Sequence, residues 1–244
     1  MKKFCVIGNP VIHSKSPKIF NYIFNSLNIK AKYYTQEILE DYLFEEFILK
    51  NKSKYSGFNI TAPFKQLAYN TVDQIHSSAC QFNSVNCIKI KNDKLVGYNT
   101  DGYGFDMMLQ QRTLNLRNKT FLILGNGATA QTVCSILYDN YSNEISILGR
   151  NKLNVKKFID NINEIKLSEN VIKKYSYKKE TSYIIINCLP LNIDEKSTDN
   201  ILSYIPNSNI ELVMDLNYVD SNLIKKFKLL NYNIISGHEM LLFQ

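Results

Sequence analysis

The stretch that most limits how this chain can fold is TFLILGNGATAQTVCSIL, residues 120–137. A short apolar run over 120–124 leads into a glycine turn, and a segment with helical spacing follows it. The turn fits the pattern G-x-G-x-x-A, in which the first glycine makes a tight bend and the second lets the backbone approach a pyrophosphate. Strand, turn and helix in this order predict a dinucleotide-binding half. A glycine turn that binds no ligand is the alternative that this segment alone leaves open.

Strand and helix patterns alternate on both sides of this segment. Repeated strand-helix-strand units predict mostly parallel sheets, and Asn92-Asp93 between two alternating runs predicts one antiparallel hairpin. We therefore expect two α/β domains, an N-terminal one with a mostly parallel sheet and a C-terminal Rossmann-like one, with a helix over 102–114 connecting them. The predicted strands are 4–8, 32–38, 55–60, the hairpin 87–100, 120–124, 145–150, 181–190 and 211–216.

Composition excludes several classes of protein. A length of 244 residues with 45% hydrophobic residues suits two globular domains with real cores. The net charge of +7 is spread over scattered lysine pairs without an Arg-aromatic stripe, so we expect small anionic ligands and no nucleic acid.

The same composition bears on where the protein works. An odd count of 5 cysteines without a C-x-x-C pair predicts reduced thiols and a cytoplasmic protein. The apolar run at the N-terminus is cut at Gly8, too short for a signal peptide, and no run reaches the roughly 18 apolar residues of a membrane span. No metal site is predicted.

The residues after the second strand of the dinucleotide half bear on the coenzyme. NAD enzymes carry a carboxylate there for the ribose 2′-hydroxyl, whereas this chain has Gly149-Arg150-Asn151-Lys152. A guanidinium suits a 2′-phosphate, which favours NADP over NAD. Taken alone, Arg150 is better explained as a surface cation at a strand end.

Several separated motifs together resemble the shikimate dehydrogenase family, in the family's order and spacing and over essentially the whole chain. Its three signature segments correspond to GNPVIHSKSP (8–17), NITAPFK (59–65) and GYNTDGYGF (97–105). The other matching segments are NSVN (83–86), GNGATA (125–130), NCLPL (187–191), DLNY (215–218) and GHEMLLFQ (237–244).

The resemblance implies a reversible reduction of 3-dehydroshikimate to shikimate with NADPH, a step toward chorismate and the aromatic amino acids. It also implies a substrate domain of residues 1–101 plus 237–244, a dinucleotide domain of residues 102–236, and a cleft between them. A small-molecule substrate is the expected partner, and the protein is expected to be a monomer or a homodimer. Two alternatives stay open, an NAD-dependent quinate/shikimate dehydrogenase and a weakly active shikimate-binding paralogue.

The resemblance also assigns roles to residues of the substrate domain. Lys65 and Asp101 match the catalytic pair, with Lys65 donating to the oxygen that gains negative charge during reduction and Asp101 orienting Lys65 and the reacting hydroxyl. Read singly, a lysine after a turn is usually solvated, and Asn or Asp at a strand end is often a turn former. The implied substrate-binding residues are Ser14 and Ser16 for the carboxylate, and Asn59, Thr61, Lys65, Asn86, Asp101, Tyr218 and Gln244 for the rest.

For the coenzyme, the resemblance implies contacts from the glycine loop, the residues after the second strand and three later segments. The implied residues are Gly125, Asn126, Gly127, Ala128, Thr129, Ala130, Arg150, Asn151, Lys152, Asn187, Leu216, Gly237 and Met240. The chain departs from the family at Asn83-Ser84, where Gly-Ala is usual, and at Asn154, where a second basic residue is usual. The family also continues past the glutamine matched by Gln244 with a further helical segment.

Overall fold

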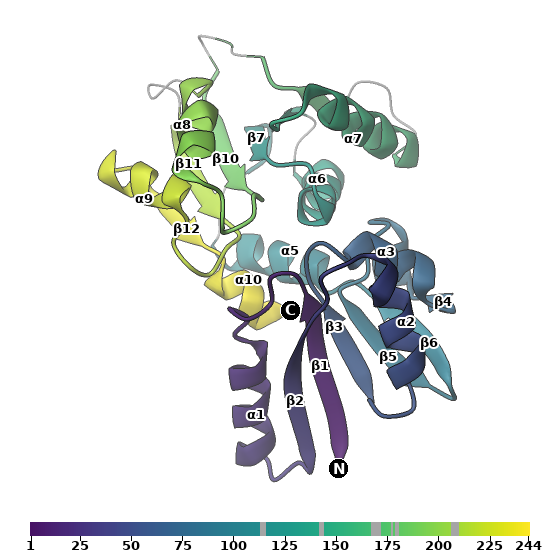
Figure 1. Ribbon diagram of the computed structural model, residues 1–244. Helices are drawn as coiled ribbons and strands as arrows, with labels where there is room; N and C mark the ends of the chain where they lie inside the picture. The colour runs from purple at the N-terminus through teal and green to yellow at the C-terminus, as the bar shows by residue number, and fades with distance from the viewer. Residues whose placement is uncertain (113–115, 142–143, 167–171, 177, 179–180, 206–209) are drawn as a thin grey trace. The chain divides into compact units, whose positions relative to one another are not determined.

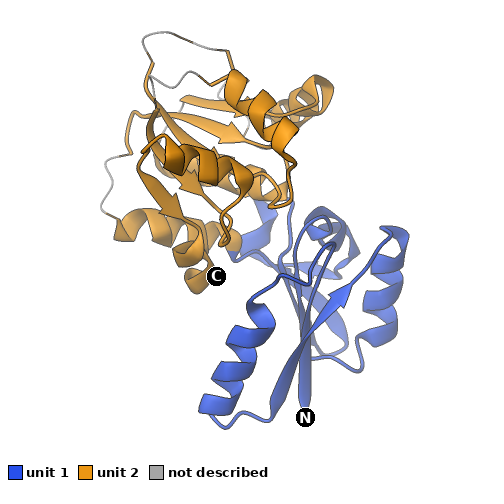
Figure 2. Ribbon diagram, turned by 60° about the vertical axis from the view of Figure 1, so that its left-hand side comes forward, with its two compact units in different colours: residues 1–100 blue, residues 101–244 orange. Residues whose placement is uncertain are grey.

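The computed structural model describes residues 1–112, 116–141, 144–166, 172–176, 178, 181–205 and 210–244. The chain divides into two compact units, residues 1–100 and residues 101–244 (Figure 2). Each unit has one six-stranded sheet with helices packed on it (Figure 1), which confirms the predicted two-domain α/β fold. Within the described ranges, no helix is both long and apolar enough to span a bilayer.

The sheet of the first unit has the strand order β2-β1-β3-β5-β6-β4. β1 runs parallel to β2 and β3, while β3, β5 and β6 are antiparallel neighbours, so the predicted hairpin is confirmed. β4 is a short strand that the sequence patterns did not indicate. The strands are β1 (Lys2–Gly8), β2 (Ala31–Glu37), β3 (Gly57–Ile60), β4 (Gln74–Ile75), β5 (Cys87–Lys91) and β6 (Lys94–Tyr98).

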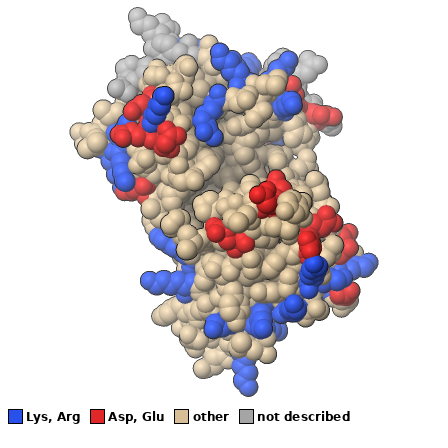
Figure 3. Space-filling model, viewed as in Figure 1, with Lys and Arg blue, Asp and Glu red and all other residues tan. Residues whose placement is uncertain are grey.

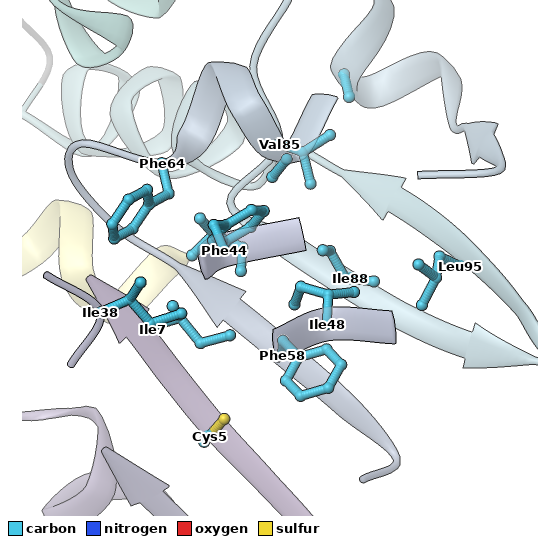
Figure 4. Packing of buried hydrophobic residues seen from close by; sticks show 13 residues of the cluster. Cys5, Ile7, Ile38, Phe44, Ile48, Phe58, Phe64, Val85, Ile88 and Leu95 are labelled. Carbon is cyan, nitrogen blue, oxygen red and sulfur yellow. The ribbon is translucent and has the colours of Figure 1, made fainter. Parts of the chain in front are cut away.

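Helices cover both faces of this sheet because its strands alternate apolar side chains to either side. One face forms the larger core, where Phe44 and Ile48 of α2 pack with Phe58 and Ile88 of the sheet (Figure 4). The other face carries a smaller cluster around Tyr33 of β2, against which Phe24 of α1 packs. The helices are α1 (Ser16–Ser26), α2 (Tyr42–Asn51), α3 (Lys65–Thr71) and α4 (Ser77–Cys80).

The second unit has an all-parallel sheet in the order β12-β11-β10-β7-β8-β9. The order reverses between β7 and β10, and in doubly wound sheets ligands bind at the carboxyl ends of the strands flanking that reversal. The strands are β7 (Thr120–Leu124), β8 (Glu144–Leu148), β9 (Ile172–Lys174), β10 (Tyr183–Asn187), β11 (Ile210–Asp215) and β12 (Ile234–Ser236). The helices between them are α6 (Ala128–Asn140), α7 (Lys152–Ile165), α8 (Glu195–Ser203) and α9 (Asn222–Leu229).

Two further helices of this unit, α5 (Asp101–Gln111) and α10 (His238–Phe243), pack against each other. A Cβ on Gly104 of α5 would lie 2.8 Å from the carbonyl oxygen of Met240, so a glycine is needed for this approach. Arg112 and Glu239 add an ion pair between the two segments. The structure therefore groups residues 237–244 and Asp101 with the second unit, whereas the sequence prediction placed them in the substrate domain. Residues 113 and 114, the end of the predicted connecting helix, lie outside the described part of the chain.

The Ser84 hydroxyl offers a test of packing in the first unit. Ser84 is fully buried, and among the described residues its Oγ has no hydrogen-bond partner. A buried polar group without a partner costs about 1–3 kcal/mol. We expect Ser84→Ala to raise the free energy of unfolding by about 1 kcal/mol in urea denaturation. Thr198→Val is the matched control, because the buried Thr198 hydroxyl donates to the Asp194 carbonyl and its removal should destabilise the protein. Destabilisation by Ser84→Ala would contradict the prediction.

Candidate active site

In the first unit, the carboxyl ends of β1 and β3 lie side by side and lead into polar loops. The backbone N–H of Thr61 donates to the Ile7 carbonyl at 2.8 Å. A Cβ on Gly8 would lie 2.3 Å from Cγ2 of Thr61, so only glycine lets the end of β1 pass this close. Phe64 N–H then closes a turn onto the Thr61 carbonyl at 3.1 Å, and α3 starts at Lys65. The strand ends thereby fix where Thr61 and Lys65 stand.

Asn59 and Asn86 are joined by hydrogen bonds at the same edge of the sheet. Asn59 Nδ2 donates to the Asn86 carbonyl at 3.3 Å. The Asn86 side chain in turn accepts from Thr100 N–H and donates to Thr100 Oγ1, both at 2.9 Å. Val85 N–H donates to the Lys65 carbonyl at 2.9 Å, which ties the start of α3 to the segment that carries Asn86. Three predicted site residues, Asn59, Lys65 and Asn86, are thus brought into one bonded framework.

Ser14 and Ser16 stand at the start of α1, and a residue that the motifs did not reveal lies between Ser16 and this framework. Ser14 Oγ accepts from the Ser16 N–H at 3.3 Å. The Tyr33 hydroxyl donates to Asn59 Oδ1 at 2.6 Å, and Ser16 lies close enough to Tyr33 to lower the pKa of its hydroxyl. Tyr33 lies within β2, outside every motif that resembles the family, so the available sequence signal was only its position on the strand.

Lys65 and Asp101 fall in different units. Lys65 is half-buried at the first position of α3, and Asp101 is buried at the first position of α5. Asp101 directly follows Thr100, whose N–H and hydroxyl are held by Asn86. Their catalytic pairing stays a prediction, as do the substrate contacts of Tyr218 and of Gln244, which belong to the second unit as well.

The glycine loop of the second unit has the geometry that a pyrophosphate requires. Gly125 has a φ of +107°, and a Cβ there would lie 3.3 Å from the backbone of Cys188. Gly127 precedes α6 and offers no side-chain cap, and a Cβ on it would meet nothing within 4 Å. The first N–H groups of α6 thus have no side-chain cap from Gly127, and the dipole of such a helix start favours negative charge. Ala130 behind them is fully buried, while Ala128 and Thr129 are half-buried.

The residues after β8 stand next to this loop. A Cβ on Gly149 would lie 3.2 Å from Asn126 Oδ1, so Asn126 lies against the end of β8. Arg150 and Lys152 are exposed there. Asn151 Oδ1 accepts from two N–H groups at the start of α7, at 2.9 and 3.1 Å, which makes this side chain the cap of α7. A coenzyme contact by the Asn151 amide stays a prediction, with its oxygen already used by the helix.

Asn187 and Asp215 end the strands on the other side of the order reversal. Asn187 Nδ2 donates to Asp215 Oδ1 at 2.9 Å, and Asn217 donates to the same oxygen from its backbone and its side chain. Burial raises the pKa of the Asp215 carboxyl to about 6, against hydrogen bonds that lower it. These hydrogen bonds hold the ends of β10 and β11 together, and Leu216 directly follows the end of β11. Asp215, Tyr218 and His238 are among the residues lining a cavity of about 150 Å³ beside it.

Gly237 and Met240 lie where the chain returns to this edge of the sheet. A Cβ on Gly237 would lie 2.5 Å from the carbonyl oxygen of Leu216, so the two segments touch through a glycine. Met240 is buried in α10. The structure thus brings Asn187, Leu216 and Gly237 together at one edge, while their contacts to a coenzyme stay predictions.

Comparison with known proteins covers both units. The family model of the shikimate dehydrogenase substrate binding domain matches residues 6–88, and that of shikimate / quinate 5-dehydrogenase matches residues 108–197. A shikimate dehydrogenase (NADP(+)) of Nitrosopumilus maritimus is 30% identical over 247 residues, covering 100% of this chain and 90% of the relative. This chain belongs to the shikimate dehydrogenase family.

Two further comparisons agree with that membership. A shikimate dehydrogenase (NADP(+)) of Staphylococcus aureus is 31% identical over 248 residues, covering 99% of this chain and 89% of the relative. A crystal structure of a shikimate dehydrogenase in complex with NADP⁺ has a TM-score of 0.81 and 28% identity, covering 100% of this chain and 86% of that chain. The resemblance seen in the motifs is therefore confirmed over the full length.

The charge distribution fits a family that acts on small molecules. On the face in Figure 3, Lys and Arg side chains stand apart with acidic side chains among them, and they form no continuous basic stripe. Proteins that bind nucleic acid concentrate such charge along one face. The expectation that this protein binds no nucleic acid stays a prediction, supported on the face that is shown.

The raised pKa of Asp215 generates a pH-dependent prediction. Its ordinary pKa is 3.8 and its folded pKa about 6, so the folded state binds a proton more tightly than the unfolded state. The stability from this proton is complete below about pH 4 and is lost as pH rises through about 6. Asp215→Asn should abolish this trend while leaving an oxygen to accept the same bonds. We therefore expect the difference in Tm, wild type minus Asp215→Asn, to fall by several degrees from pH 5 to pH 8 in dye-based thermal scans.

A surface carboxylate supplies the control for that experiment. Asp199, whose side chain is 60% exposed, pairs with Lys226 on the surface of the same unit. Its replacement in Asp199→Asn should leave a nearly constant Tm difference between pH 5 and pH 8. A Tm difference for Asp215→Asn that is equally constant would show that the buried carboxyl does not hold its proton.

Proposed function

We propose that this chain is an NADP-dependent oxidoreductase that reversibly reduces 3-dehydroshikimate to shikimate, a step of the shikimate pathway toward the aromatic amino acids. The observation that carries the proposal is the group of polar side chains of Ser16, Asn59 and Asn86 next to Lys65, called the substrate wall below. The chain is also similar over its full length to shikimate dehydrogenases (NADP(+)). Shikimate is a carboxylate with several ring hydroxyls, and this wall offers hydroxyl and amide groups that bind both.

Substrate binding divides between the two ends of this wall. Ser14 supplies a hydroxyl just before α1 and Ser16 one at its first position, where the helix dipole also favours a carboxylate. Asn59, Thr61 and Asn86 supply donors and acceptors to the ring oxygens. Asp101, Tyr218 and Gln244 complete the proposed set of substrate contacts.

Lys65 is the proposed proton donor. Reduction of the ketone places negative charge on its oxygen, and an ammonium beside that oxygen stabilises the charge and then gives up a proton. In the reverse direction the same nitrogen takes the proton of the hydroxyl. Asp101 is proposed to orient Lys65 and the reacting oxygen, so the two residues act as a pair.

The glycine loop and the residues after β8 are proposed to hold NADP, which supplies or accepts a hydride when bound. The N–H groups at the start of α6 bind the pyrophosphate, since Gly127 leaves their approach open. Arg150, with Lys152 near it, neutralises the 2′-phosphate. A carboxylate would favour a free 2′-hydroxyl instead, and residues 149–152 include none. Asn187, Leu216, Gly237 and Met240 are proposed to face the nicotinamide end.

Location and assembly remain part of the proposal. The thiols of Cys5 and Cys134 are buried, and burial raises the pKa of both, to about 12 for Cys5. Such thiols are unreactive and suit a reducing cytoplasm. We propose a cytoplasmic monomer or homodimer whose partners are small molecules.

The decisive experiment measures NADPH oxidation with 3-dehydroshikimate. We expect Lys65→Ala to lower kcat by about 10²-fold or more with a modest change in KM, because the ammonium acts chiefly in the transition state. Lys50→Ala is the matched control, since Lys50 is an exposed lysine that pairs with Glu46 on α2. Equal turnover of Lys65→Ala and wild type would rule out the catalytic role of Lys65.

The two glycines of the loop allow coenzyme binding and stability to be separated. At Gly125 a side chain meets both a positive φ and the Cys188 backbone, so Gly125→Ala should lower the Tm by several degrees. At Gly127 a side chain meets only open space, so Gly127→Ala should keep the Tm and weaken NADPH binding by about tenfold or more, because the methyl group fills the phosphate's place. Fluorescence titration of NADPH measures the second effect. Wild-type NADPH affinity in Gly127→Ala would contradict the proposed phosphate site.

A further inference from the structure

Tyr33 is a buried polar residue between the two ends of the proposed substrate wall. It is 3% exposed, its hydroxyl donates to Asn59, and Ser16 lies near it. Burial raises the pKa of Tyr33 far above its usual range, with neighbouring Cys5 and Cys87 raising it further and Ser16 lowering it. The hydroxyl therefore keeps its proton at any physiological pH.

The hydrogen bonds around Tyr33 can run in one direction only. The Asn86 carbonyl is purely an acceptor, so the Asn59 amide must turn its Nδ2 toward it. Oδ1 of Asn59 then faces Tyr33 and accepts its single hydroxyl proton at 2.6 Å. With that proton used, the Tyr33 oxygen is left only as an acceptor, with Ser16 near it. The chain of donors runs from Tyr33 to Asn59 to the Asn86 carbonyl.

The Tyr33 ring is held firmly enough to set this direction. Phe20 of α1 stacks on it with ring centroids 4.8 Å apart and an angle of 7° between the planes. Asn21 of α1 clamps the Tyr33 backbone, donating to its carbonyl and accepting from its N–H, both at 2.9 Å. The same residue thereby docks α1, which begins at Ser16, onto β2.

We propose that Tyr33 is a positioning residue that fixes the Asn59 amide with its second Nδ2 hydrogen directed to a ring oxygen of the substrate. The inference rests on the proposed function, in which Asn59 and Ser16 bind substrate. Without the Tyr33 hydroxyl, Asn59 Oδ1 loses its donor, and the amide is held at one end only, by the 3.3 Å bond from its Nδ2 to the Asn86 carbonyl. The amide then turns more freely and holds the ring oxygen of the substrate less well.

The test compares wild type, Tyr33→Phe and Tyr34→Phe in shikimate oxidation with NADP. Tyr33→Phe keeps the stacked ring, so its Tm should stay within a few degrees of wild type. We expect its KM for shikimate to rise about tenfold, with kcat within about threefold of wild type and KM for NADP unchanged. Tyr34→Phe removes the same hydroxyl from the next residue of β2, which packs on the opposite face, and should leave all three constants unchanged.

A second measurement separates action through Asn59 from a general loosening of β2. Calorimetric Kd values for shikimate are measured for Asn59→Ala alone and with Tyr33→Phe added. If Tyr33 acts through Asn59, the added change raises Kd less than about twofold. An unchanged KM in Tyr33→Phe, or a full tenfold loss on top of Asn59→Ala, would overturn the inference while leaving the proposed function intact. Wild-type protein that neither oxidises nor binds shikimate would overturn the proposed function instead.

Discussion

The structure of the first unit depends on β3 being bonded on both of its edges. β3 runs parallel to β1 on one edge and antiparallel to β5 on the other, and Gly57 is needed there because a Cβ would lie 2.8 Å from the Ile88 carbonyl. At its end, the Asn86 carbonyl accepts from the Ile60 backbone and from the Asn59 side chain. Because β5 is antiparallel, Asn86, which directly precedes it, lies at the carboxyl ends of β1 and β3. In a purely parallel sheet, the residue before a strand would lie at the opposite edge.

The second unit differs because it is proposed to hold the pyrophosphate with backbone N–H groups, whereas the first unit is proposed to hold its ligand with side chains. Gly125 turns the chain sharply at the end of β7, and the N–H groups of α6 are left without a side-chain cap. The Asn187–Asp215 cluster across the order reversal joins the ends of β10 and β11, with Asn187 Nδ2 donating to Asp215 Oδ1 and Asn187 Oδ1 accepting from the Leu189 N–H. The Asn187 side chain therefore holds two strand ends together, and its contact to the coenzyme stays a prediction.

Much of the fold was predictable from the sequence because local signals and tertiary structure agree. The apolar run 120–124 is a strand with those bounds, and Ser16-Pro17 opens a helix as expected. β4 was missed because two residues give no periodicity, and β12 because three residues give little more. The last residues pack on α5 through Gly104, a close approach that no local pattern encodes. Asn151 was predicted to bind coenzyme, and only the two bonds to α7 show that its oxygen caps a helix.

Tyr33 shows most clearly why motifs locate ligand contacts better than the residues behind them. A side chain that meets a ligand is limited by the ligand's chemistry, and such limits leave short recognisable patterns. Tyr33 is limited by partners that are 12 to 26 positions away in sequence, Asn21 and Asn59. Within β2 it reads as one more aromatic residue of an alternating strand, which packing alone would explain. Its hydroxyl becomes informative only when the donor and acceptor capacity of every neighbour is counted, since that count fixes the direction of the whole chain of bonds.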